Sequence, residues 1–169
     1  DLDGTRPPDA SSSQSVSIEP WGLEAMDVLR GASSALYGSG QLGGIINAVS
    51  KRPTLHQQNE VTIQTGSYSR VQGAVDVGGA LNKSKTLLWR FNGLLRKSDT
   101  YAINIKNNEV YVAPSLRWQP DSKPAFTILS SYEQLDAGST AKFLPANGTV
   151  YPSRYGYLAR NFLSSDANF

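Results

Sequence analysis

Between Asn59 and Leu135, apolar and polar positions alternate with a period of two, as expected for β-strands, whose successive side chains point to opposite faces. The segment 87–96 shows the alternation most clearly: Trp89 lies on an apolar face, whereas Arg90 and Asn92 share the opposite face. A face that carries arginine and asparagine does not suit the inside of a dry sandwich. The pattern predicts five strands, near residues 61–65, 70–77, 87–96, 110–118 and 126–133.

The strand lengths and the connections favour a membrane barrel. Each strand is about ten residues long, which suffices to cross a bilayer when tilted. Residues 81–85 and 119–123 form short turns, whereas residues 98–107 and those after 135 form long loops. Short turns on one rim and long loops on the other are typical of outer-membrane barrels, and the aromatics near the short turns suit a girdle. These are Trp89, Trp118 and Phe126. A soluble antiparallel sheet with an aromatic core remains an alternative at this point.

The first 52 residues follow a different pattern, which predicts a small mixed α/β unit. Residues 1–20 are rich in Ser, Asp and Pro and are expected to form a loop. Residues 19–24 predict a short helical turn, 26–30 a strand, and 32–37 a short helix that ends at Gly38. The β-branched run 44–50 predicts a buried strand, closed by Pro53.

Composition excludes several classes of function. The 169 residues contain no Cys and only one His, His56, so a disulfide framework, a thiolate zinc site and a multi-His metal site are excluded. The formal net charge of +2 is far below the surplus of a nucleic-acid-binding module. Neither a Ser/His/Asp arrangement nor a carboxylate pair stands out, so we expect no enzyme. The chain starts at Asp1 without a leader, and we expect a piece of a longer protein.

Residues 38–43 fit the spacing G-x-G-x-x-G of dinucleotide-binding loops. Such a loop requires a long helix directly after it, but here a β-like run reaches Pro53 within ten residues. The glycines are better explained as tight turns where one backbone passes close to another.

Residues 18–31, 34–38 and 43–54 resemble the plug of TonB-dependent outer-membrane receptors, and within them the hydroxamate (ferrichrome-type) ferric-siderophore branch. Residues 111–121 and 143–150 resemble the barrel of the same receptors. The chain departs from the family at Ala25, where Arg is common, and at Ala32, where Pro is common.

The resemblance implies a mixed α/β plug fragment followed by antiparallel transmembrane β-barrel strands, about 5 of an implied 22. Residues 1–53 are then the C-terminal part of the plug and residues 54–169 the N-terminal part of the barrel. The protein is expected in the outer membrane of a Gram-negative bacterium as a monomeric barrel in contact with lipid. It would take up ferric siderophores with energy from the TonB-ExbB-ExbD complex, without a resident cofactor or metal.

The resemblance also suggests which residues bind ligand. The plug apex carries Ser12, Ser13 and Gln14, whose side chains donate hydrogen bonds to siderophore oxygens. Phe143 aligns with a binding aromatic of the third extracellular loop, and Tyr151 and Tyr155 are nearby candidates. Because the siderophore wraps the iron, no metal ligands are expected from the protein.

Arg30 is expected to act as a latch between plug and barrel. A buried guanidinium needs an acidic partner, and in the family that partner lies on the barrel wall, here beyond Phe169.

Two other functions stay open. One is TonB-dependent uptake of another ligand: haem, cobalamin or a carbohydrate. The other is a soluble β-rich binding module that shares only the alternation of apolar and polar residues.

Overall fold

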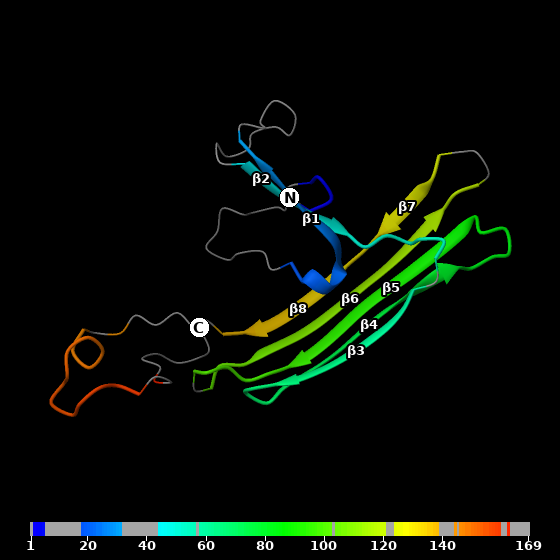
Figure 1. Ribbon diagram of the computed structural model, residues 1–169. Helices are drawn as coiled ribbons and strands as arrows, with labels where there is room; N and C mark the ends of the chain where they lie inside the picture. Colours follow the sequence, from blue (N-terminus) through cyan, green and yellow to red (C-terminus); the bar gives the residue numbers. More distant parts are fainter. Residues whose placement is uncertain are drawn as a thin grey trace.

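The computed structural model describes residues 2–5, 18–31, 44–56, 58–102, 104–120, 124–138, 144, 146–159 and 162. These residues form mostly antiparallel strands with little helix, arranged as a two-stranded hairpin that lies against one face of a large curved sheet (Figure 1). Among them, no helix has the length and apolar character needed to span a membrane.

The hairpin consists of β1 (Leu23–Arg30) and β2 (Gly44–Ser50), which pair antiparallel. It is preceded by the 3-10 helix η1 (Pro20–Gly22), whose first turn is capped by the Glu19 carboxylate. The strand predicted at 44–50 is confirmed, but it is not buried as a whole: Ala48 is 2% exposed, whereas Ile46 is 56% exposed. The turn predicted at 19–24 is shorter, because Leu23 already pairs with Ser50. The helix predicted at 32–37 lies outside the described residues.

The large sheet is built from long neighbouring strands paired in chain order. They are β3 (Gln58–Gly66), β4 (Arg70–Ala80), β5 (Leu87–Lys97) and β6 (Asn107–Trp118). The first four of the five predicted strands are confirmed, and each extends one to three residues further than the alternation indicated at one end or both. The alternation of apolar and polar residues therefore located these strands well, because one face of the sheet is covered and the other is open.

The two faces of the large sheet differ in chemistry. The face toward the hairpin is polar and buried, with Asp76 at 2% and Arg90 at 4% exposure. A small apolar cluster of Ala74, Leu94 and Tyr111 lies on the same face beneath Trp21. The opposite face is apolar and exposed; it includes Val61, Ile63, Val71, Leu95, Trp118, Phe126 and Ile128. The sheet is thus the inverse of a soluble one, with its polar side covered.

The fifth predicted strand is interrupted. β7 (Phe126–Leu129) and β8 (Tyr132–Ala137) both pair with β6, and a single register carries through both. The break falls opposite Pro114, whose carbonyl accepts from the Ser130 N–H at 3.3 Å. In an antiparallel ladder the N–H of the same residue would return a bond to Ser130, and proline has none. One missing donor therefore divides the strand.

The long and short connections lie at opposite ends of the sheet. At one end the loop after β5 meets the turn after β3, where the Asp99 N–H donates to the Tyr68 carbonyl at 2.9 Å. At the other end the Gln119 N–H donates to the Thr86 carbonyl at 2.7 Å, joining the two short turns. The chain passes from the hairpin into β3 through Pro53 at this short-turn end.

Replacing Pro114 with alanine should join β7 and β8 into one strand. The new N–H would donate to the Ser130 carbonyl and add about 0.5–1.5 kcal/mol to stability. We expect slow amide hydrogen exchange at residue 114 and slower exchange at residues 130–131 in the complete protein, measured against the unchanged β4–β5 ladder. Rapid exchange at residue 114 would contradict this account of the break.

Candidate functional site at the contact between hairpin and sheet

The hairpin touches the large sheet through one end, which we call the foot: residues 19–24, before and at the start of β1, and residues 50–53, at the end of β2. The two segments are joined to each other, since the Lys51 N–H donates to the Gly22 carbonyl at 2.9 Å. Within the described residues, the ion pairs between hairpin and sheet all come from the foot.

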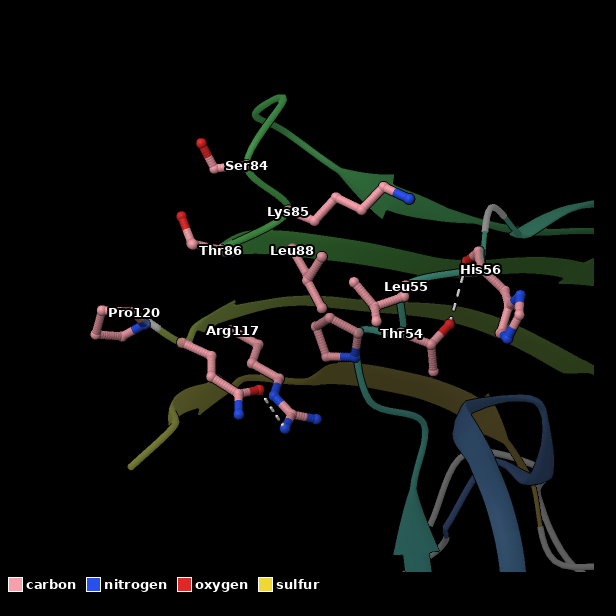
Figure 2. A pocket seen from close by; sticks show the side chains of 11 residues that line it. Thr54, Leu55, His56, Ser84, Lys85, Thr86, Leu88, Arg117 and Pro120 are labelled. Carbon is pink, nitrogen blue, oxygen red and sulfur yellow. Dashed lines mark hydrogen bonds between the residues drawn. The ribbon is translucent and has the colours of Figure 1, made fainter. Parts of the chain in front are cut away.

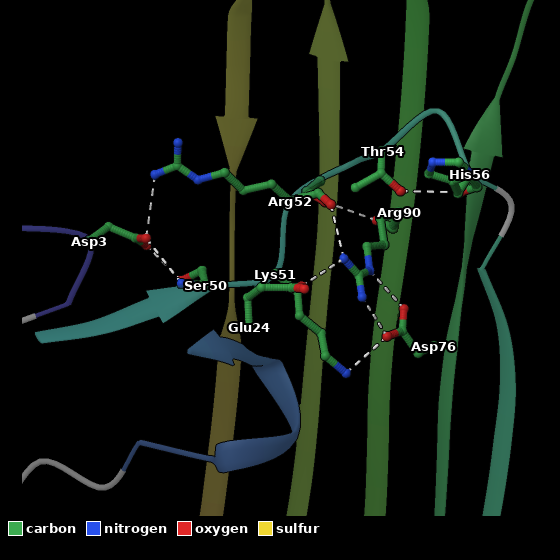
Figure 3. Close-up of polar contacts among 10 residues, drawn as sticks. Asp3, Glu24, Ser50, Lys51, Arg52, Thr54, His56, Asp76 and Arg90 are labelled. Atoms are coloured by element: carbon green, nitrogen blue, oxygen red, sulfur yellow. Dashed lines mark hydrogen bonds and ion pairs between the residues drawn. The ribbon is translucent and has the colours of Figure 1, made fainter. Parts of the chain in front are cut away.

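The first group of ion pairs, the Asp76 cluster, consists of Glu24, Lys51, Asp76 and Arg90 (Figure 3). Arg90 donates to both carboxylate oxygens of Asp76, from Nε at 2.9 Å and from a terminal nitrogen at 2.8 Å. Lys51 Nζ lies 2.9 Å from the same carboxylate, and Glu24 lies 3.1 Å from the other terminal nitrogen of Arg90. The cluster holds two charges of each sign and is neutral.

The register of the sheet explains how Arg90 reaches Asp76. Arg90 lies directly opposite Gly78, and Asp76 lies opposite Asn92. Because Gly78 has no side chain, the guanidinium can extend diagonally to the carboxylate two residues away. The Asn92 amide, with its nitrogen toward Asp76, lies 2.9 and 3.3 Å from the two carboxylate oxygens. The buried aspartate is therefore surrounded by donors, as a buried charge requires.

The second group, the Arg96 cluster, consists of Glu19, Arg96 and Glu109. Arg96 donates to Glu109 on the neighbouring strand and, at 3.1 Å, to Glu19 of the foot. The other oxygen of Glu19 accepts the N–H of Trp21, so the residue that caps η1 also ties it to the sheet. The cluster bears a net charge of −1.

Trp21 and Gly22 complete the contact. The Trp21 indole N–H donates to the Val75 carbonyl at 3.1 Å, and the Lys51 ammonium lies 4.5 Å from the centre of the indole ring. Gly22 packs directly on the Tyr111 ring, where a β-carbon would overlap the Tyr111 hydroxyl and ring edge. Position 22 therefore requires glycine, because its backbone lies so close to the Tyr111 ring that no side chain fits between them.

Two cavities border the foot. One, of about 130 Å³, lies between foot and sheet and is lined by polar groups that include Ser50, Asn92 and Ser115. The other, of about 500 Å³, lies at the short-turn end around Leu55 and Leu88, with His56, Lys85 and Arg117 at its edges (Figure 2). His56 is exposed there.

The binding residues suggested by the resemblance are only partly described. Ser12, Ser13, Gln14 and Phe143 lie outside the described residues. Tyr151 and Tyr155 lie in the loop 146–158, beyond β8, with 63% and 90% of their surface exposed. Their position beyond β8 places them past the long-loop end, away from the foot.

Arg30, the expected latch, is exposed at the end of β1, and no ion pair within the described part of the chain includes it. Its expected partner lies beyond residue 169, so its role stays a prediction. The described ion pairs between hairpin and sheet come instead from Glu19, Glu24 and Lys51, which the sequence did not single out. The sequence did show that one face of β5 is polar, which is a signal for buried ion pairs. Which residues pair with that face depends on the strand register, which the sequence does not show.

Comparisons with known proteins show what the chain is similar to. Residues 2–45 match the model of the TonB-dependent Receptor Plug Domain. The chain is 32% identical to the ferrioxamine receptor of Yersinia enterocolitica over 168 residues, which are 99% of this chain and 23% of that protein. It is 34% identical over 135 residues to the ferrichrome outer membrane transporter/phage receptor of Escherichia coli K12, covering 80% of this chain and 18% of that protein.

A solved structure shares the fold. The closed form of the ferric-catecholate import receptor Fiu from E. coli K12 matches with a TM-score of 0.76 at 24% identity. The match covers 90% of this chain and 21% of that one. The chain thus spans about a fifth to a quarter of the length of these two curated relatives.

Replacing Gly22 with alanine should lift the foot from the sheet, because the added methyl group overlaps Tyr111. We expect faster proteolysis of the hairpin in the complete protein. Gly22→Ala combined with Tyr111→Ala should restore protection in part, whereas the combination with Tyr111→Phe should not, because the ring remains. Equal protection of Gly22→Ala and the parent would show that this contact does not hold the foot.

Proposed function

We propose that this chain, a part of a TonB-dependent receptor, belongs to an outer-membrane protein that takes up ferric siderophores with energy from the TonB complex. The observation that carries the proposal is the plug match followed by a sheet whose polar face lies under the plug and whose apolar face is open. That arrangement suits a barrel wall between lipid and a plugged interior.

The boundary between plug and barrel lies at Pro53, so that residues 1–53 form the C-terminal part of the plug and 54–169 the start of the barrel. Support comes from the path of the chain, which leaves the foot at Pro53 and enters β3 at Gln58. With the plug entering from the periplasm, the short turns face the periplasm and the loops at 98–106 and after 138 face outward.

The exposed apolar face of the sheet contacts lipid. On β5 it extends from Leu87 to Leu95, which corresponds to about 26 Å of strand at about 3.3 Å per residue. A barrel presents an apolar band of about 25 Å to the bilayer, bordered by aromatic residues. Trp118 and Phe126 are paired neighbours at the short-turn end of this face, where one such border belongs.

Siderophore binds where the plug apex meets the outer loops. Ser12, Ser13 and Gln14 supply hydrogen bonds, and Phe143, Tyr151 and Tyr155 supply aromatic surface. The exposure of Tyr151 and Tyr155 at the long-loop end supports this assignment, since exposed tyrosines there are available to a ligand. The iron arrives as a complete complex, and the TonB-ExbB-ExbD complex acts from the periplasmic side.

The substrate class is tested by iron-limited growth. A strain that lacks its own siderophore receptors, carrying the complete gene, should grow on purified ferric hydroxamates and should lose this growth when TonB is deleted. Growth only on haem, or uptake only of cobalamin or a carbohydrate, would assign another substrate. A product that is soluble without detergent and shows no heat-modifiable migration would exclude the barrel.

Replacing Phe143 with alanine should weaken ferric-hydroxamate binding by about tenfold, because an aromatic surface that packs on the ligand is lost. Binding is measured by titration of the purified complete receptor. Tyr157→Ala serves as the matched control, since Tyr157 is another exposed aromatic of the same loop. Unchanged affinity of Phe143→Ala would remove Phe143 from the site.

Replacing Arg30 with alanine should loosen the plug, because its acidic partner on the wall would be left without a counter-charge. We expect faster plug proteolysis and slower transport than in Arg52→Ala, whose described ion pair is a 3.6 Å contact with Asp3 inside the N-terminal unit. If both measurements match those of the parent, Arg30 is not a latch.

A further inference from the structure

The ion pair between Asp76 and Arg90 lies within the large sheet, which is the proposed barrel wall. The remaining terminal nitrogen of Arg90 donates to the plug, to Glu24 at 3.1 Å and to the Arg52 carbonyl at 3.0 Å. Asp76 and Arg90 lie on adjacent wall strands, their side chains are 3% and 5% exposed, and two hydrogen bonds of 2.8–2.9 Å join them. Buried opposite charges with this geometry neutralise each other. The wall therefore carries no net charge here, but the order of its two charges is fixed: negative on β4, positive on β5.

The plug presents the same two signs in the complementary order. Lys51 meets Asp76 at 2.9 Å, and Glu24 meets Arg90 at 3.1 Å. Lys51 is held in place by the Trp21 ring and is only 14% exposed. Glu24 lies on β1 and Lys51 directly follows β2, and the foot is fixed by the bond from the Lys51 N–H to the Gly22 carbonyl. The spacing of the two plug charges is thus set by the plug itself.

We propose that Glu24 and Lys51 are positioning residues that recognise the order of charges in the Asp76–Arg90 pair and so fix the rotational setting of the plug in the barrel. The inward face of a barrel is polar all round, so a plug that recognised polarity alone could sit in several settings. A plug that recognises an ordered pair has one. The inference rests on the proposed receptor architecture and adds to it the feature that selects one setting.

The physical basis is the difference between matched and reversed contact. In the observed setting each plug charge contacts the wall charge of opposite sign, and the wall pair is neutral by itself. With the plug charges exchanged, Glu24→Lys would face Arg90 and Lys51→Glu would face Asp76. The repulsion is strongest at Asp76, because the Lys51 and Asp76 side chains are 14% and 3% exposed, whereas the Glu24 side chain is 58% exposed and solvent screens its charge. The Arg96 cluster cannot replace this discrimination, because the plug contributes only Glu19 to it.

The test exchanges charges in the complete receptor and measures plug seating without siderophore, as ion conductance in planar bilayers. The plug variant Glu24→Lys/Lys51→Glu should open at least about tenfold more often than the parent. The wall variant Asp76→Arg/Arg90→Asp should open to a similar extent. The four substitutions together should restore closure, since the order of charges matches again. Heat-modifiable migration reports whether each wall has folded.

The matched control is Lys97→Glu/Asp99→Lys, a neutral exchange between exposed residues at the long-loop end, which should stay closed. A plug variant as closed as the parent would overturn the proposal. So would failure of the fourfold variant to close although its wall folds. These readouts do not depend on which ligand is transported, so a failed growth test would leave them interpretable.

A second variant covers the case in which the exchanged wall does not fold. Asp76→Asn/Arg90→Gln removes both wall charges and keeps side chains of similar size. On this neutral wall the preference for the parent plug over the charge-exchanged plug should fall to what the loss of the Lys51–Trp21 contact leaves, because no order of charges remains to be recognised. The variant Lys51→Gln measures that loss, and a preference on the neutral wall as large as on the parent wall would overturn the proposal.

Discussion

The arrangement of the molecule depends on the ion pair between Asp76 and Arg90. A sheet with charges on its covered face is stable only if those charges are paired inside it or by whatever covers it. Here both conditions hold, since the pair is complete within the wall and is extended by Lys51 and Glu24. The polar face can therefore fold as part of a wall and still accept a plug. The apolar face carries no charges that must be paired, and it is exposed.

The strands of the wall could be predicted from the sequence because burial contrast imposes a period of two over each of them. The strands of the hairpin were harder to predict from the sequence. β1 starts at Leu23, three residues earlier than predicted, because η1 is a single turn that ends at Gly22. The interruption at Ser130 had a visible cause in Pro114, but its effect depends on which side of β6 the missing N–H faces. That side is set by pairing rather than by local sequence.

The candidate site was predictable only in part, for the same reason. The alternation placed Arg90 and Asn92 on one face, but not the residue opposite them. Gly78 opposite Arg90 is what lets the guanidinium reach Asp76, and only the register supplies it. Glu19 and Lys51 lie in segments whose pattern indicated a turn and a strand end, and neither position suggests a contact more than 20 residues away in the chain. The candidate ligand residues were suggested by the resemblance alone, because the alternation of apolar and polar residues carries no information about ligand contacts.

The buried Pro53 gives the contact between the foot and the large sheet an intramolecular character. Lys51 is two residues from this junction, and the chain runs from there directly into the wall. After a separation, the lysine stays tethered within a short reach of Asp76, so its return is an intramolecular event with a high effective concentration. The foot would then return to the large sheet along a short tether rather than by diffusion of a free domain.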